Sequence, residues 1–169
     1  MKKILMPDYM FQKYDDVTPE FLSEIGVRAL IIDIDNTLAP YEQPQPDERL
    51  LSWVENMQKS GVAMTLMSNN ERERVELFNR DMGLPAYYKS GKPLSKNLKR
   101  AMENMGSDKN NTAVLGDQLL TDALAGNLLG LRAIIVPPIK DKTSLFFRFK
   151  RLCERPTVKK FKKRNSIDW

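Results

Sequence analysis

Short apolar segments alternate with amphipathic helical segments along most of this chain, and this order restricts the fold more than any other feature. Apolar residues at helical spacing, closed by a glycine, predict helices at residues 47–59, 71–82, 94–105 and 121–129. The apolar segments predict five buried strands, at residues 30–32, 62–67, 85–88, 112–115 and 133–136. Such alternation is typical of a parallel sheet with helices on both faces. We therefore expect an α/β, Rossmann-like three-layer sandwich around a five-stranded parallel sheet.

Residues able to do chemistry follow the ends of these strands. Asp33 and Asp35 leave the first strand at alternate positions, so an extended backbone points both carboxylates to the same side. Like charges about 6–7 Å apart repel each other unless a cation lies between them. The alternative is a polar turn that only closes the strand. Ligands of such sheets bind beyond the strands' carboxyl ends, so one crevice should collect the polar residues found there. The later members are Ser68, Lys92 and Asp117.

Composition excludes several kinds of chemistry. The 169 residues contain no histidine and one cysteine, Cys153, so serine–histidine hydrolysis, cysteine–histidine catalysis and histidine-ligated zinc are ruled out. Carboxylates, hydroxyls, lysines and a hard metal ion remain. No apolar run approaches the roughly 18 residues that span a bilayer, and the first residues lack a signal-peptide core. We expect a cytoplasmic protein, with a peripheral position at the inner face of the membrane as an option.

Two parts of the chain differ in charge. Residues 140–169 hold eleven basic and three acidic residues, a net charge of +8, which leaves −3 of the total +5 for residues 1–139. We expect one domain over residues 1–139, with its motif-bearing core at 29–136, followed by a basic tail. Residues 1–28 predict a lead-in with one short helix from Thr18 to Gly26.

The motifs resemble those of the haloacid dehalogenase (HAD) superfamily of phosphohydrolases, in the order that family shows. Asp33-Ile34-Asp35-Asn36-Thr37 is similar to its first motif, D-x-D-x-T. The resemblance implies that Asp33 attacks phosphorus and becomes an aspartyl-phosphate, and that Asp35 protonates the leaving group and then activates water. It implies phosphate-binding roles for four other residues, of which Lys92 would neutralise phosphoryl charge. These four are Thr37, Ser68, Asn69 and Lys92.

Gly116-Asp117 followed by Asp122 resembles the family's fourth motif, G-D-x-x-x-x-D. Asp117 would bind the metal directly, together with Asp33 and the backbone carbonyl of Asp35, while Asp122 would orient that ligand or a metal-bound water. Such oxygen ligands favour Mg²⁺. Each residue also has an ordinary explanation: Ser68 could cap a helix, Lys92 is one of 27 basic residues, Asp117 could close a strand, and Asp122 could sit in a first helical turn.

Spacing bears on the substrate. Only 30 residues separate Leu38 from Ser68, and 24 separate Ser68 from Lys92, which leaves no room for an inserted cap domain. The chain therefore resembles the capless subclass III phosphatases, and Asp33-Ile34-Asp35-Asn36-Thr37-Leu38 together with the lead-in resembles the bacterial YqeG family. That family is related to phosphatidylglycerophosphate phosphatases. The resemblance implies a phosphorylated small molecule or a lipid head group as substrate.

Two functions of different kinds remain open. The first is a Mg²⁺-dependent phosphomonoesterase; the alternative is an RNA- or ribosome-associated binding protein with a vestigial phosphatase site. A phosphoacceptor signalling domain fits less well, because Asp35 and Thr37 suit a hydrolase. The sequence leaves the oligomeric state open.

The basic tail predicts contact with an anionic surface. Leu145, Phe149 and Leu152 would share one face of a helix that begins near Thr143, with arginines beside them. After Pro156, residues 159–164 are too rich in charge for us to expect any of them in a core. Such a tail would bind an anionic membrane or, as the weaker alternative, RNA.

Overall fold

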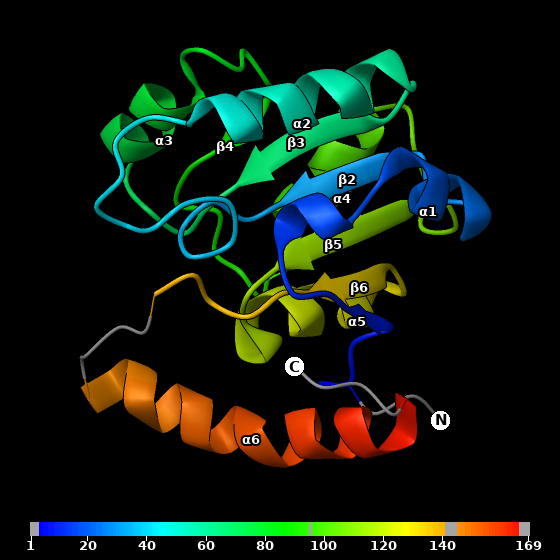
Figure 1. Ribbon diagram of the computed structural model, residues 1–169, viewed down its shortest axis with the longest axis vertical. Helices are drawn as coiled ribbons and strands as arrows, with labels where there is room; N and C mark the ends of the chain where they lie inside the picture. The colour runs from blue at the N-terminus through cyan, green and yellow to red at the C-terminus, as the bar shows by residue number, and fades with distance from the viewer. Residues whose placement is uncertain (1–3, 95, 141–144, 166–169) are drawn as a thin grey trace.

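A six-stranded parallel sheet forms the centre of the computed structural model (Figure 1), which describes residues 4–94, 96–140 and 145–165. The strands run in the order β1-β6-β5-β2-β3-β4, and every neighbouring pair is parallel. Their bounds are β1 (Tyr9–Met10), β2 (Ala29–Ile32), β3 (Ala63–Met67), β4 (Ala86–Tyr87), β5 (Thr112–Gly116) and β6 (Arg132–Ile135). The chain moves outward from β2 to β4, then returns to β5 on the other side of β2. Strand order therefore reverses between β2 and β5, where ligands of such sheets bind.

Helices cover both faces of the sheet, as the alternating direction of strand side chains requires. Leu30 and Ile32 face a core that also contains residues of α1 (Pro19–Glu24), α2 (Glu48–Lys59) and α3 (Arg72–Asn79). Ile31, between them, faces the opposite core with residues of α4 (Lys96–Asn104) and α5 (Leu124–Leu129). The three-layer α/β sandwich predicted from the sequence is confirmed.

The predicted number of strands needs correction. The sheet has a sixth strand, β1, which lies in the predicted lead-in and pairs with β6; two residues are too few to give a period-two pattern. The N-cap of the helix after β3 makes no side-chain hydrogen bond to the helix. Glu71 occupies that position, while Asn70 directs its amide nitrogen to Asp35.

A short π-helical turn, η2 (Leu119–Ala123), joins β5 to α5 and carries Asp122. The predicted helix at residues 121–129 therefore begins in a wider turn than an α-helix allows. This turn brings Asp122 back under the end of β5, where its carboxylate packs against Gly116 so closely that a Cβ there would overlap it. Gly116 is therefore the residue that this close approach requires.

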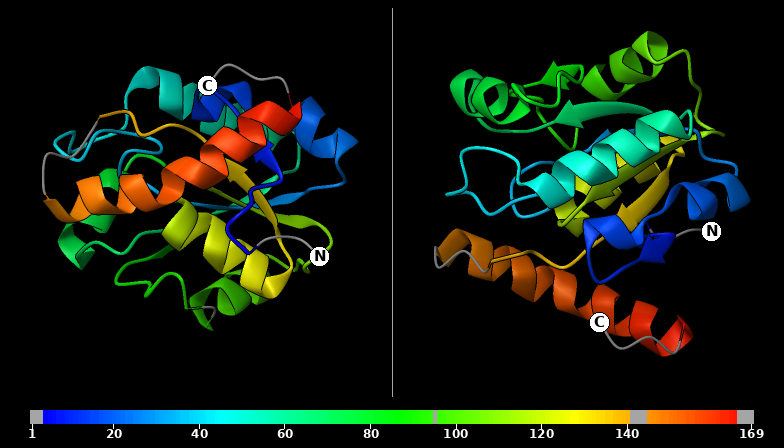
Figure 2. Two further views of the ribbon diagram at one scale, coloured as in Figure 1. Left: turned by 90° about the horizontal axis from the view of Figure 1, so that it is seen from below. Right: turned by 45° about the horizontal axis from the view of Figure 1, so that its top comes forward.

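The tail forms one helix, α6 (Leu145–Asn165), which continues across Pro156. Figure 2 shows it lying along the side of the molecule near β6 and α5. Phe161 is buried in a cluster with Met6, Met10 and residues of η2 and β6. Our expectation that no residue of 159–164 enters a core is thus wrong, because the helix turns Phe161 toward the domain while Lys159 and Lys160 stay exposed.

Where the side chains of α6 are described, a glutamate rather than Leu152 lies against the rest of the molecule. Leu152 is 58% exposed, whereas Glu154 is buried and its Oε1 accepts a hydrogen bond from the backbone nitrogen of Leu120 at 3.1 Å. The side chains of Leu145 and Phe149 lie outside the described residues. Among the residues described, no helix is long and apolar enough to cross a membrane.

Candidate active site

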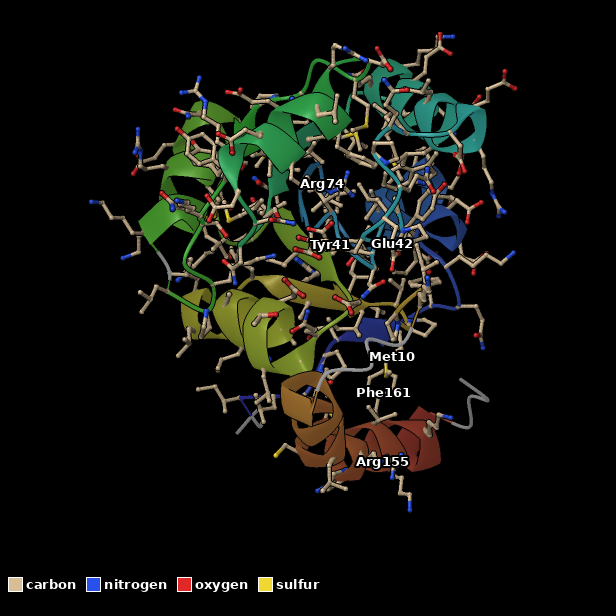
Figure 3. All side chains as sticks on the ribbon, turned by 90° about the vertical axis from the view of Figure 1, so that its left-hand side faces the viewer. Met10, Tyr41, Glu42, Arg74, Arg155 and Phe161 are labelled. Atoms are coloured by element: carbon tan, nitrogen blue, oxygen red, sulfur yellow. The ribbon has the colours of Figure 1, made fainter. Side chains whose placement is uncertain are left out.

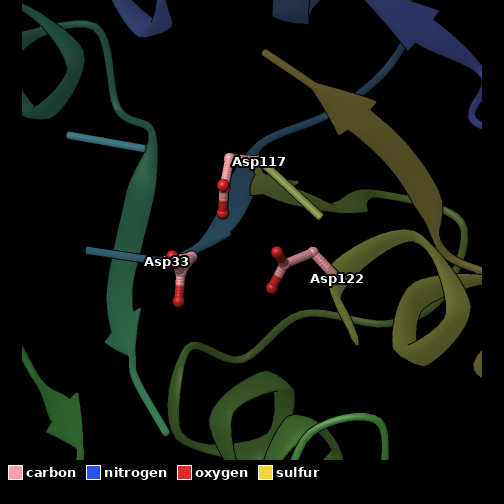
Figure 4. A group of neighbouring side chains, drawn as sticks. All are labelled: Asp33, Asp117 and Asp122. Atoms are coloured by element: carbon pink, nitrogen blue, oxygen red, sulfur yellow. The ribbon is translucent and has the colours of Figure 1, made fainter. Parts of the chain in front are cut away.

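Three carboxylates and one ammonium group meet at the carboxyl ends of β2 and β5. Oxygens of Asp33, Asp117 and Asp122 lie within 4.8 Å of one another, and all three residues are buried (Figure 4). Asp33 directly follows β2 and Asp117 directly follows β5, so the pairing of these two strands sets their separation. Of the residues predicted to converge at this sheet edge, Asp33, Lys92 and Asp117 meet in the cluster, whereas Asp35 and Ser68 contact each other outside it.

Lys92 ties two of these carboxylates together. Its Nζ donates to Asp33 Oδ1 at 2.6 Å and to Asp122 Oδ1 at 2.7 Å, and its side chain is 3% exposed. Burial alone would lower the pKa of Lys92, but the Asp122 and Asp33 carboxylates outweigh that effect and raise it above the ordinary value. The lysine therefore stays charged at neutral pH.

Asp33 is the carboxyl group whose ionisation the site changes most clearly. Burial raises the pKa of Asp33 to about 6, the charges of Asp122 and Asp35 add to the rise, and Lys92 opposes it. Its second oxygen, Oδ2, accepts a hydrogen bond from Thr37 Oγ1 at 3.2 Å. Asp33 is thus held by a donor on each oxygen and ionises near neutral pH.

The cluster suits a hard divalent cation. In the described part of the chain the Lys92 ammonium binds two of these three buried carboxylates, and burying so many acidic groups together is costly. All the candidate ligands are carboxylate oxygens, the donors that Mg²⁺ and similar ions prefer. Asp122 also accepts from the backbone nitrogen of Gln118 at 3.1 Å, so the turn after β5 fixes its direction.

Asp35 turns away from this cluster. Its Oδ1 accepts from Arg74 Nε at 3.2 Å and Nη2 at 3.1 Å, and its Oδ2 accepts from Asn70 Nδ2 at 3.0 Å and Ser68 Oγ at 3.4 Å. Neither Arg74 nor Asn70 was among the predicted site residues. Arg74 carried no signal in the sequence, because an arginine in the first turn of a charged helix resembles any solvated residue.

Ser68 and Asn69 organise the loops around the site. Besides its contact with Asp35, Ser68 accepts from the backbone nitrogen of Asn70 at 3.0 Å. Asn69 accepts from Ser90 Oγ and from the backbone nitrogen of Lys92, and donates to the carbonyl of Lys92. Asn69 thus fixes the backbone that presents the Lys92 ammonium. Its contact with phosphate stays a prediction.

Known proteins are similar to this chain in sequence and in fold. Residues 89–140 match the HAD-hydrolase-like family. The chain is 39% identical over 169 residues to the probable phosphatase YqeG of Bacillus subtilis (strain 168), covering 100% of this chain and 98% of that one.

Solved structures share the fold at lower identity. An uncharacterised protein from Listeria monocytogenes serotype 4b has a TM-score of 0.55 at 15% identity, over 70% of this chain and 85% of that chain. The cobalt-bound deoxy-D-mannose-octulosonate 8-phosphate phosphatase from Haemophilus influenzae has a TM-score of 0.52 at 11% identity, over 79% and 91%. At these identities the likeness concerns the fold alone.

Proposed function

The chain belongs to the haloacid dehalogenase superfamily and is a phosphatase of that superfamily, and on this basis we propose that it is a Mg²⁺-dependent phosphomonoester hydrolase working through an aspartyl-phosphate. The observation that carries the proposal is the buried cluster of Asp33, Asp117 and Asp122 around the ammonium of Lys92. Burying three carboxylates at the ends of β2 and β5 costs free energy that a bound cation can offset, and a protein that only binds RNA has no use for such a cluster.

In the first step Asp33 attacks the phosphorus atom in line with the leaving oxygen. A bond forms between a carboxylate oxygen and phosphorus, the bond to the leaving oxygen breaks, and Asp35 gives that oxygen a proton. In the second step Asp35 takes a proton from water, the water oxygen binds phosphorus, and the bond to Asp33 breaks. The contact between Lys92 and Asp33 supports a role in neutralising the phosphoryl oxygens next to the nucleophile.

We assign the metal ligands to Asp33, Asp117 and the backbone carbonyl of Asp35, with Asp122 orienting Lys92 and the turn after β5. When bound, Mg²⁺ would reduce the repulsion between the Asp33 carboxylate and the anionic phosphate. Thr37 and Ser68 would hold phosphate oxygens through their hydroxyls, since both are buried beside the two aspartates of the first motif.

For the substrate, we propose a phosphomonoester on a large or surface-bound molecule, such as the lipid head group of phosphatidylglycerophosphate. Between Leu38 and Lys92 the described elements are only α2, β3, α3 and β4, which supports a site without an inserted cap. An open crevice accepts a head group that remains in its membrane, whereas a closed one would need to extract it.

Phosphate release from p-nitrophenyl phosphate and from an alkyl phosphate, measured with Mg²⁺ and with EDTA, tests the proposal. We expect turnover in Mg²⁺ and its loss in EDTA, and Asp117→Ala should raise the Mg²⁺ concentration required. Wild-type protein without turnover on any phosphomonoester, together with tight RNA binding, would favour the alternative of an RNA-associated protein with a vestigial site. A metal titration unchanged by Asp117→Ala would contradict the assignment of Asp117.

A further inference from the structure

Arg74 holds the Asp35 carboxylate in one orientation. Two of its guanidinium nitrogens donate to Asp35 Oδ1, and the side chains of Arg74 and Asp35 are only 13% and 12% exposed. Solvent and salt therefore screen this ion pair much less than a surface pair. The other donors, Asn70 and Ser68, both bind Oδ2, so in the described contacts Arg74 alone fixes Oδ1.

The guanidinium group is itself fixed from two other sides. Its Cζ lies 4.9 Å from the ring centroid of Phe78, which is fully buried one turn further along α3. Its Nη1 donates to the carbonyl of Pro44 at 3.4 Å and its Nη2 to the carbonyl of Pro40 at 3.5 Å. A lysine at this position could supply the charge but could not make these contacts in one plane.

The backbone that Arg74 contacts belongs to the loop between the first motif and α2. Figure 3 looks onto the carboxyl ends of the strands and shows Arg74 close to Tyr41 and Glu42 of this loop in that view. Tyr41 is 50% exposed, so the loop presents an aromatic side chain to solvent. Arg74 therefore connects Asp35 to a segment that borders the site.

We propose that Arg74 is the positioning residue for Asp35, aiming the acid/base carboxylate at the leaving-group oxygen. The proposal rests on the phosphatase activity and the role of Asp35 proposed above. Proton transfer requires the carboxylate within hydrogen-bond reach of that oxygen, and a misplacement of about 1 Å can cost roughly a hundredfold in rate. Without Arg74, Asp35 keeps donors on one oxygen only, and its carboxylate can rotate away from the leaving group.

The test compares Arg74→Gln and Arg74→Lys with Arg72→Gln as the matched control. Arg72 lies on the same helix and makes an ion pair with Glu76, but it is exposed and, in the described part of the chain, forms no hydrogen bond or ion pair with Asp35. Turnover is measured in Mg²⁺ with p-nitrophenyl phosphate, whose leaving group departs without a proton, and with glycerol 3-phosphate, whose leaving group needs one. Thermal unfolding of each variant is recorded in parallel.

We expect Arg74→Gln to lower kcat on glycerol 3-phosphate by about tenfold or more, with KM changed by less than about threefold. The loss on p-nitrophenyl phosphate should be clearly smaller, Arg74→Lys should recover only part of the activity, and Arg72→Gln should match the wild type. When Asp35 is already replaced by asparagine, adding Arg74→Gln should lower kcat by less than about twofold, because Arg74 acts through Asp35.

Several results would overturn the inference. Equal losses on the two substrates, a loss confined to KM, or a full additional loss in the Asp35→Asn background would each mean that Arg74 supports the loop rather than the acid/base. If Arg74→Gln does not fold, Arg74→Lys decides by the same comparison. If the wild type is active and the Arg74 variants have the same activity, this inference alone is contradicted. If the wild type is inactive on both substrates, the proposed function is contradicted as well.

Discussion

Asp33 and Lys92 are both buried, and burying a charged group costs free energy unless a partner offsets it. Each is stabilised by its neighbours, above all by the ion pair between them. The order of the motifs was enough to predict that Asp33, Lys92 and Asp117 lie close together. It could not show that Asp122 binds Lys92, because that contact depends on the π-helical turn and on the absence of a side chain at Gly116. Nor could the motifs point to Arg74, because its contact with Asp35 forms only when α3 lies against the first motif.

The ionisation of Asp33 predicts how metal-free protein responds to pH. Its pKa is about 6 in the folded chain and near 3.8 when unfolded, so the folded state binds more protons between these values. The contribution of Asp33 to the free energy of unfolding is therefore fully present below pH 3.8 and is lost as pH rises through about 6. Mg²⁺ needs ionised carboxylates, so its stabilising effect should grow over the same range.

Thermal unfolding from pH 5 to pH 8, in EDTA and in Mg²⁺, measures both effects. The increase in Tm caused by Mg²⁺ should be larger at pH 8 than at pH 5, and in Asp33→Asn the Mg²⁺ effect should be small throughout. An equal Mg²⁺ effect at both pH values in the wild type would mean that the ion binds away from Asp33.

Gly116→Ala is expected to displace Asp122, because the new methyl group would overlap its carboxylate. Asp122 would then lose its hydrogen bond to Lys92, and we expect activity to fall by about tenfold to a hundredfold. Gly61→Ala is the matched control: Gly61 has a φ of 79° but no neighbour within 4 Å of an added Cβ. That control should lower the free energy of unfolding by about 1 kcal/mol, seen as a lower Tm, and leave activity unchanged. Wild-type activity in Gly116→Ala would contradict the role given to Asp122.

Among the elements, α6 departs most from what the sequence predicts. Phe161 is a buried aromatic residue within a run of lysines and arginines. A helix allows this, because it turns Phe161 toward the domain while Lys159 and Lys160 stay exposed. Glu154 gave no sequence signal either, yet its buried carboxylate accepts a hydrogen bond from the turn that carries Asp122. The strands were easier to predict, because four of the five runs expected are nearly all apolar.

We propose that the outer side of α6 is attracted to an anionic membrane, with exposed Arg155 and Lys159 among the contributing residues. Each basic residue near such a surface adds about 1 kcal/mol, so Arg155→Gln with Lys159→Gln should weaken binding to anionic vesicles by roughly tenfold or more. Co-sedimentation with anionic and neutral vesicles at two salt concentrations measures this. Substitutions are preferable to cutting the chain at Pro156, which would remove buried Phe161.

Arg28→Gln with Lys59→Gln is a control for charge alone, since it removes the same charge outside α6 and should leave vesicle binding nearly unchanged. Binding that is equal for neutral and anionic vesicles would contradict the proposal. Tighter binding to RNA than to anionic lipid at the same salt would support RNA as the partner of the tail instead.

At the scale of the whole molecule, the return of the chain to β5 beside β2 creates the site. The fold class followed from alternating strands and helices, but the order β1-β6-β5-β2-β3-β4 did not, because no local pattern states which strands pair. The sequence placed Asp33 and Asp117 at strand ends; the crossover that makes β2 and β5 neighbours brings their carboxylates within reach of one ion.

Asp33 as the nucleophile of a metal-dependent phosphatase is the claim on which the rest depends. Asparagine at position 33 keeps the size of the side chain and can still accept a hydrogen bond from Lys92, so Asp33→Asn should fold. An amide is not a competent nucleophile toward phosphorus. The direct test is the rate of phosphate release from p-nitrophenyl phosphate in saturating Mg²⁺, measured for the wild type and for Asp33→Asn. Thermal unfolding of both proteins checks that the variant is folded. We expect the variant to lose at least about a thousandfold in kcat, whereas a rate within about tenfold of the wild type would contradict the covalent mechanism.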